Sequence, residues 1–141
     1  MGPPEIVLDT NVVVSGLRSR HGNSFHLLSL IGAGHFEINL SVPLLLEYEA
    51  TLKRPELKIP LSHAQVDDVL GFFCSVARCV RIHYLWRPLL PDAKDDFVAE
   101  LAVAGQCDYI VTFNERDFRG VQQFGVHTCT PQYLLQVIED E

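Results

Sequence analysis

The sequence predicts an α/β fold, a three-layer sandwich in which helices flank a central, mainly parallel β-sheet. Two short apolar runs, residues 6–8 (IVL) and 108–112 (DYIVT), have the continuous hydrophobicity of strands that are buried on both faces. Helix-like segments alternate with the strand candidates along the chain. The 141 residues contain no repeat, low-complexity segment or linker, so we expect a single domain over residues 1–141.

Proline, glycine and capping residues set the expected bounds of the elements. Ser41 before Pro43, and Thr130 before Pro131, are typical of a helix N-cap with proline in the first turn. Gly32 is typical of a helix end. We expect strands at residues 6–8, 36–40, 79–84, 108–112 and 125–128. We expect helices at residues 23–31, 42–53, 62–76 and 92–104, and from 131 to the acidic tail at 139–141. A second apolar run at residues 12–14 follows the first strand and leads into a polar loop at 18–22.

Composition and charge narrow the classes of function. Eighteen Asp and Glu residues against 11 Lys and Arg residues give a net charge of -7. This balance counts against nonspecific nucleic-acid binding, which depends on contacts between Lys or Arg and phosphate. It is compatible with a nuclease that concentrates carboxylates at a metal site and keeps a local basic rim. No run approaches the ~18 apolar residues of a membrane helix, and the N-terminus MGPPE lacks signal-peptide features, so we expect a cytoplasmic protein.

Cysteine and histidine spacing does not indicate a zinc site. The chain has no CxxC pair and no HxxxH pair. We expect the cysteines to be buried small hydrophobic residues in a reducing compartment. They are Cys74, Cys79, Cys107 and Cys129.

Polar residues follow both apolar strands where each strand ends. Asp9 follows the first strand, with Thr10 and Asn11 after it. The carboxyl ends of parallel strands are where open α/β sheets hold ligands, so Asp9 is a candidate ligand. A turn cap through an Asx-type hydrogen bond explains Asp9 equally well. The residues after the second strand, which ordinary turn chemistry also explains, are Thr112, Asn114 and Asp117.

Two helices carry further candidate acids. Glu47 and Glu49 flank the apolar stripe of the expected helix at 42–53 at similar angles, so periodicity does not choose between them. For either, a solvated helix-face charge is the ordinary interpretation. Asp92 and Asp95 resemble a capping box at a helix start, where the helix dipole favours acids. Asp95 would alternatively lie beside a face of small alanines that allows close approach to another element.

Together, these acids predict an oxygen-rich pocket at one edge of the sheet. Carboxylates that are crowded without lysines beside them repel one another unless protons or cations intervene. Mg²⁺ or Mn²⁺ is the natural partner of such ligands. The reaction best served is metal-assisted phosphoester hydrolysis.

Four segments in order resemble the motifs of PIN-domain ribonucleases, which occur as toxins in VapBC-type toxin–antitoxin pairs. The segments are VLDTNVVVSGL, SVPLLLEYEATLKRP, DAKDDFVAELA and DYIVTFNERDF. The resemblance implies that Asp9, Glu47 (rather than Glu49) and Asp95 are catalytic metal ligands. The last segment supplies Thr112 and an acidic cluster. Thr10, Asn11, Thr112 and Asn114 are the implied supporting residues.

Asn114 departs from the family pattern, because many members carry an aspartate two residues after the threonine. A neutral amide can orient a metal-bound water, but it lowers the negative charge available for a second cation. Asp117 is the candidate substitute, as a fourth catalytic and metal-binding acid. We therefore expect one well-held metal ion and a weaker second one.

The resemblance further implies cleavage of single-stranded RNA with Mg²⁺ or Mn²⁺, a homodimer and a cognate antitoxin protein. Basic residues near the motifs are candidates for the local rim, although surface charge explains each of them. They are Arg18, Arg20, Lys53, Arg54, Arg116 and Arg119. Asn114 favours an alternative, a non-catalytic PIN-like module that binds RNA or protein. A phosphatase with Asp9 as nucleophile ranks below both, because such enzymes need a second acid where this chain has Asn11.

Overall fold

A five-stranded parallel sheet forms the centre of the molecule, which confirms the predicted fold class. The computed structural model describes residues 2–82 and 93–139, without the side chains of residues 93–96. The strand order is β3-β2-β1-β4-β5, and every neighbouring pair is parallel. The strands are β1 (Glu5–Leu8), β2 (Glu37–Leu40), β3 (Arg78–Cys79), β4 (Tyr109–Val111) and β5 (His127–Cys129).

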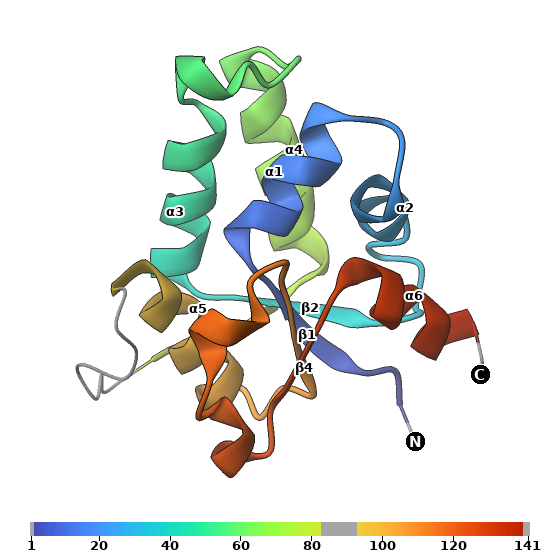
Figure 1. Ribbon diagram of the computed structural model, residues 1–141. Coiled ribbons are helices and arrows are strands. Elements are labelled where there is room, and N and C mark those ends of the chain that lie inside the picture. Colours follow the sequence, from blue (N-terminus) through green and yellow to red (C-terminus); the bar gives the residue numbers. More distant parts are fainter. Residues whose placement is uncertain (1, 83–92, 140–141) are drawn as a thin grey trace.

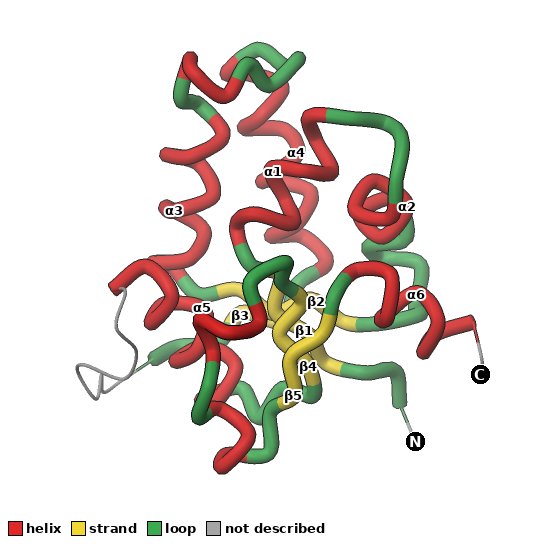
Figure 2. Tube along the Cα trace, in the orientation of Figure 1, coloured by secondary structure: helices red, strands yellow, loops and turns green. Residues whose placement is uncertain are grey.

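Helices connect successive strands and cover the sheet. They are α1 (Thr10–Arg18), α2 (Asn23–Ser29), α3 (Val42–Leu52), α4 (His63–Val76), α5 (Ala93–Ala104) and α6 (Pro131–Glu139). Short 3-10 helices are η1 (Pro55–Leu57), η2 (Glu115–Phe118) and η3 (Val121–Phe124). Figure 1 shows α1, α3 and α4 together in the upper part of the molecule and α5 at the lower left. In Figure 2 the strands occupy the middle of the molecule, with helices around them.

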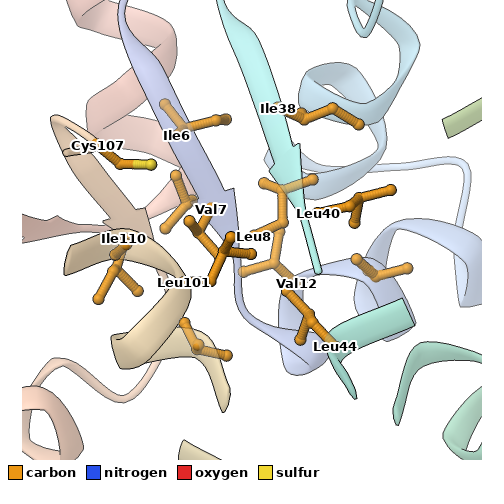
Figure 3. Packing of buried hydrophobic residues seen from close by; sticks show 14 of the residues in the cluster. Ile6, Val7, Leu8, Val12, Ile38, Leu40, Leu44, Leu101, Cys107 and Ile110 are labelled. Atoms are coloured by element: carbon orange, nitrogen blue, oxygen red, sulfur yellow. The ribbon is translucent and has the colours of Figure 1, made fainter. Parts of the chain in front are cut away.

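Strand β1 lies in the middle of the sheet, as its continuous hydrophobicity predicts. Ile6 and Val7 are fully buried, and Leu8 is almost so. They pack among residues of β2, α1, α3, α5 and β4, including Ile38, Val12, Leu44, Leu101 and Ile110 (Figure 3). Burying such side chains stabilises the fold by about 1.5–3 kcal/mol each. The central position of β1 places Asp9 near the middle of the sheet's carboxyl edge.

Asn39, a buried residue of β2, connects the three strands β1, β2 and β3. The Asn39 amide of β2 donates to the Ile6 carbonyl (3.2 Å) and to the Glu5 carboxylate (2.9 Å). Its oxygen accepts a hydrogen bond from Arg78 Nε of β3 at 2.6 Å. Since a buried amide without partners is costly, this network favours one register of β1, β2 and β3.

Several predicted capping residues are confirmed. Ser41 Oγ accepts from the Leu44 N–H at 3.4 Å at the start of α3. Ser62 and Gln65 form a reciprocal capping box at α4. Thr130 Oγ1 accepts from the Tyr133 N–H at 3.2 Å at α6. The sequence also offers Asn23 or Ser24 as the cap of α2, but Gly22 takes that position and both residues lie within the helix. The predicted helix start at Asp92 lies outside the described residues.

Three predictions from the sequence are wrong in detail. Residues 10–18, for which the pattern predicts no helix, form α1. The edge strand expected over 79–84 is the two-residue β3, because only Arg78 and Cys79 pair with β2. Cys74 and Cys79 are exposed, whereas only Cys107 and Cys129 are buried, with burial raising the pKa of their thiols to about 11 and about 12.

Among residues 2–82 and 93–139, no helix combines the length and hydropathy needed to cross a bilayer.

Candidate active site

Asp9 lies at the carboxyl end of β1, and both of its side-chain oxygens accept hydrogen bonds. Oδ1 accepts from the Thr10 N–H at 2.8 Å, which makes Asp9 the N-cap of α1. Oδ2 accepts from the Thr112 hydroxyl at 2.8 Å. Asp9 is only 8% exposed. Asp9 therefore caps a helix at the carboxyl edge of the sheet, and its role as a metal ligand stays a prediction. Capping leaves lone pairs on each oxygen for a further partner.

Thr112 is fully buried and connects three strands at the site. Its hydroxyl donates to Asp9 and accepts from the Asn114 N–H at 2.9 Å. Its own N–H donates to the Cys129 carbonyl of β5 at 2.8 Å. One threonine therefore fixes the orientation of the Asp9 carboxylate and the course of the chain after β4.

Tyr48 is a buried residue of the site, and the sequence pattern indicates only that it belongs to the apolar stripe of the helix at 42–53. Its hydroxyl donates to the Leu8 carbonyl, directly before Asp9. Burial, with the Asp9 charge as a smaller cause, raises the pKa of Tyr48 well above its usual value. Tyr48 thus stays protonated and attaches α3 to the end of β1.

The pKa of Asp9 is raised, and the causes locate its acidic neighbours. Burial is the largest cause, and the hydrogen bonds from Thr112 and Thr10 oppose it. The negative charges of Asp117 and Glu47 raise this pKa further. The fold therefore brings Glu47 of α3 and Asp117 of η2 close enough to Asp9 for their charges to act on it. Asp95 lies in α5, but its side chain is outside the described residues.

Glu47 and Glu49, which periodicity could not separate, have different surroundings. Glu47 Oε1 accepts from the Thr51 hydroxyl at 3.0 Å, and Glu47 lines a groove between α1 and α3. Glu49 accepts from Lys53 Nζ at 3.1 Å, and Lys53 also contacts Asp67 of α4 at 2.7 Å. Glu49 thus belongs to an ion-pair network between α3 and α4.

The groove beside Asp9 has a volume of about 790 Å³ and mixed polarity. Its walls are formed by residues of α1, the end of α3, η1 and Phe113, which follows Thr112. Asp9 is buried and does not line it, but Thr10 and Asn11 do. Of the six basic residues considered for a rim, Arg18 and Arg54 line this groove. Its other polar lining residues are Ser15, Ser19, Glu47 and Thr51.

The donor chemistry of the site fits a hard divalent cation. Asp9, Glu47 and Asp117 offer carboxylate oxygens, which are the ligands that Mg²⁺ and Mn²⁺ prefer. The Asn11 side-chain oxygen is buried without a hydrogen-bond partner among the described residues. Within residues 2–82 and the described side chains of 97–139, no three His, Cys, Asp or Glu residues form a ready-made metal cluster. The acids are therefore spaced more widely than in a closed cage.

Comparisons with known proteins place this geometry in a family. Residues 5–116 match the sequence model of the PIN domain. A search of curated protein sequences gave no significant match.

Solved structures of similar fold include VapBC2 from Rickettsia felis bound to a DNA fragment from their promoter. That chain is 18% identical, with a TM-score of 0.60, over 89% of this chain and 98% of the other. FitAB bound to an IR36 DNA fragment is 16% identical, with a TM-score of 0.59, over 89% and 94%. At these identities the likeness concerns the fold. Because the family match spans more than half of the sequence, the chain belongs to the PIN domain family.

Proposed function

We propose that this protein is a metal-dependent endoribonuclease that hydrolyses phosphodiester bonds in single-stranded RNA. The observation that carries the proposal is the buried Asp9 carboxylate, held by Thr112 and within the field of Glu47 and Asp117, beside an open groove. Burial, with the charges of Glu47 and Asp117 as smaller causes, raises the energy of the ionised Asp9 carboxylate, and a cation would relieve this. PIN-domain membership supports a nuclease.

The metal would be held by Asp9, Glu47 and Asp117, with Asp95 as the further acid implied by the family motif. When bound there, Mg²⁺ or Mn²⁺ supplies Lewis acidity toward the phosphate and activates a water molecule. The residues of the chain orient these partners. Thr112 and the Thr10 N–H hold the Asp9 carboxylate in one rotamer, so its free lone pairs point in fixed directions.

The groove would bind the RNA substrate. Arg18 and Arg54 line it from two different elements and can contact successive phosphates. This local positive charge offsets the net charge of -7 in the region where RNA would lie. Lys53 is held by Glu49 and Asp67, on the side of α3 that faces α4.

The experiment that tests the proposal is cleavage of an unstructured oligoribonucleotide by the purified chain. We expect cleavage with Mn²⁺ or Mg²⁺, none with EDTA, and recovery when metal is restored. Cleavage that persists in EDTA, or that an Asp9→Asn variant retains, would contradict the proposal.

Glu47 and Glu49 provide a matched pair of variants on one helix. We expect Glu47→Gln to lower kcat/KM for RNA by about 10- to 100-fold, because a metal-holding charge is lost. Glu49→Gln removes only a partly exposed pair with Lys53 and should change stability by less than about 1 kcal/mol and activity very little. Equal activity losses in the two variants would contradict the assignment of Glu47 as a metal ligand.

A non-catalytic PIN-like module is the second candidate, and Asn114 favours it. Asn114 is exposed beside Thr112 and adds no negative charge to the site. We expect Asn114→Asp to tighten Mn²⁺ binding measured by calorimetry and to raise the cleavage rate several-fold. A protein that binds RNA but cuts it in neither form would instead be the binding module.

We further propose that the nuclease is a cytoplasmic toxin that a cognate antitoxin protein neutralises, and that it forms a homodimer. The fold likeness to chains of the VapBC2 and FitAB complexes supports this role. Growth arrest on expression of the chain, absent with Asp9→Asn, would support a toxin. Sedimentation of the purified chain would test the homodimer.

A further inference from the structure

Phe113 has an unusual position for an aromatic side chain. It is 50% exposed, although it follows the fully buried Thr112. Among the described residues, other exposed aromatic rings occur at Phe25, Phe72, Phe124 and Tyr133. Of these rings, Phe113 is the one that lines the groove beside Asp9. The groove thus presents an apolar flat surface next to charged groups.

The backbone on both sides of Phe113 is held by hydrogen bonds. The Thr112 hydroxyl accepts from the Asn114 N–H at 2.9 Å and donates to Asp9 at 2.8 Å. The Asn114 carbonyl accepts from the Asp117 N–H at 3.0 Å. Because the same hydroxyl orients Asp9 and closes the turn around Phe113, the backbone that carries the ring has a fixed place relative to the acid. An aromatic side chain has few rotatable bonds, so it loses little entropy when it binds a partner.

Arg18 and Arg54 complete a set of groups that matches one class of ligand. A groove with guanidinium groups and an exposed aromatic ring is typical of sites for single-stranded nucleic acid, where phosphates contact arginines and a base stacks on the ring. A base in a duplex already has both faces stacked on its neighbours. The ring therefore favours an unpaired base, whereas the arginines alone would accept either kind of strand.

We propose that Phe113 stacks on an unpaired base beside the scissile phosphate and is the positioning residue that restricts the groove to single strands. The inference rests on the proposed function, because it takes the nucleic acid bound in the groove to be the substrate. Phe113 acts through the position of the base and takes no part in bond cleavage.

The test is fluorescence anisotropy with a labelled unstructured ten-nucleotide RNA and with its duplex, in an Asp9→Asn background that prevents cleavage. We expect Phe113→Ala to raise the Kd for the single strand by about 5- to 100-fold and to leave duplex binding unchanged. Phe113→Trp should stay within about threefold of the parent, because a larger ring also stacks. Phe124→Ala, which removes an equally exposed ring outside the groove, is the matched control.

Kinetics with intact Asp9 separates positioning from a general structural role. Phe113→Ala should raise KM far more than it lowers kcat, and Phe113→Trp should restore KM. Single-strand binding that Phe113→Ala leaves unchanged, or single-strand and duplex binding lost equally, would overturn the inference while Asp9-dependent cleavage still stood. If no cleavage occurs but single-strand binding depends on Phe113, the nuclease proposal fails and the stacking site remains.

Discussion

Asp9→Asn is expected to lower Mn²⁺-dependent cleavage of single-stranded RNA by about a thousandfold or more. The variant removes the charge that would hold the cation, and metal stabilisation of the transition state is worth several kcal/mol, at about 1.4 kcal/mol per factor of ten. The measurement is kcat/KM with circular dichroism to verify the fold. Asp108→Asn is the matched control, because Asp108 accepts from the Glu5 N–H at the opposite end of β1. A similar loss in both variants would contradict the prediction.

Thermal stability provides a second readout of the same substitution. Without metal, burial raises the folded-state pKa of Asp9 above its ordinary 3.8. Between pH 3.8 and this raised pKa, the folded state binds more protons than the unfolded state. The contribution of Asp9 to the free energy of unfolding is therefore lost as the pH rises across this interval. Mn²⁺ at a hundred times its Kd should raise the free energy of unfolding of the parent chain by about 2.7 kcal/mol, which corresponds to roughly 8 °C in Tm. We expect no such increase in Asp9→Asn.

Thr112→Val is expected to destabilise the fold by about 2–4 kcal/mol and to lower cleavage by about a hundredfold. Valine has nearly the same shape, but it leaves a buried Asp9 oxygen and the Asn114 N–H without their partner. An Asp9 side chain held only by the Thr10 N–H would then position the cation poorly. Urea unfolding and the cleavage assay measure the two effects.

Two controls separate the Thr112 hydroxyl from the rest of the side chain. Thr112→Ser keeps the hydroxyl and should retain most activity. Thr128→Val removes a threonine hydroxyl that contacts Glu115 at an exposed position, and it should change stability by less than about 1 kcal/mol. If Thr112→Val were as stable and active as Thr112→Ser, the proposed role of the hydroxyl would be wrong.

Helix α1 shows why local pattern alone did not predict every element. Its sequence TNVVVSGLR contains three consecutive β-branched valines, which favour strands, and a glycine. Tertiary contacts override this preference. Asp9 caps the helix, Val12 and Val13 are fully buried, and a Cβ on Gly16 would lie only 2.4 Å from Leu28. The Asp9 cap is adjacent in sequence, but the burial of the valines and the contact at Gly16 depend on residues outside the helix, which its local pattern does not contain.

The candidate site was predictable to the extent that topology determined it. Parallel strands place Asp9 and Thr112 at one sheet edge, which the apolar runs indicated. The i,i+4 spacing of Glu49 and Lys53 is a signal in the sequence that separates Glu49 from Glu47. The buried Tyr48 hydroxyl and the groove position of Phe113 depend on how α3 and the segment between β4 and η2 pack, which periodicity does not report. The role of Asp95 stays a prediction.

The hydrogen bond between Asp9 and Thr112 joins residues that are 103 positions apart. Thr112 is in turn held by Cys129, near the end of the chain. During synthesis, a nascent chain that has not yet exposed β4 and β5 therefore has Asp9 but neither its orienting hydroxyl nor the strands that bury it. For a nuclease that acts on RNA, this order of assembly would delay activity until β4 and β5 have left the ribosome.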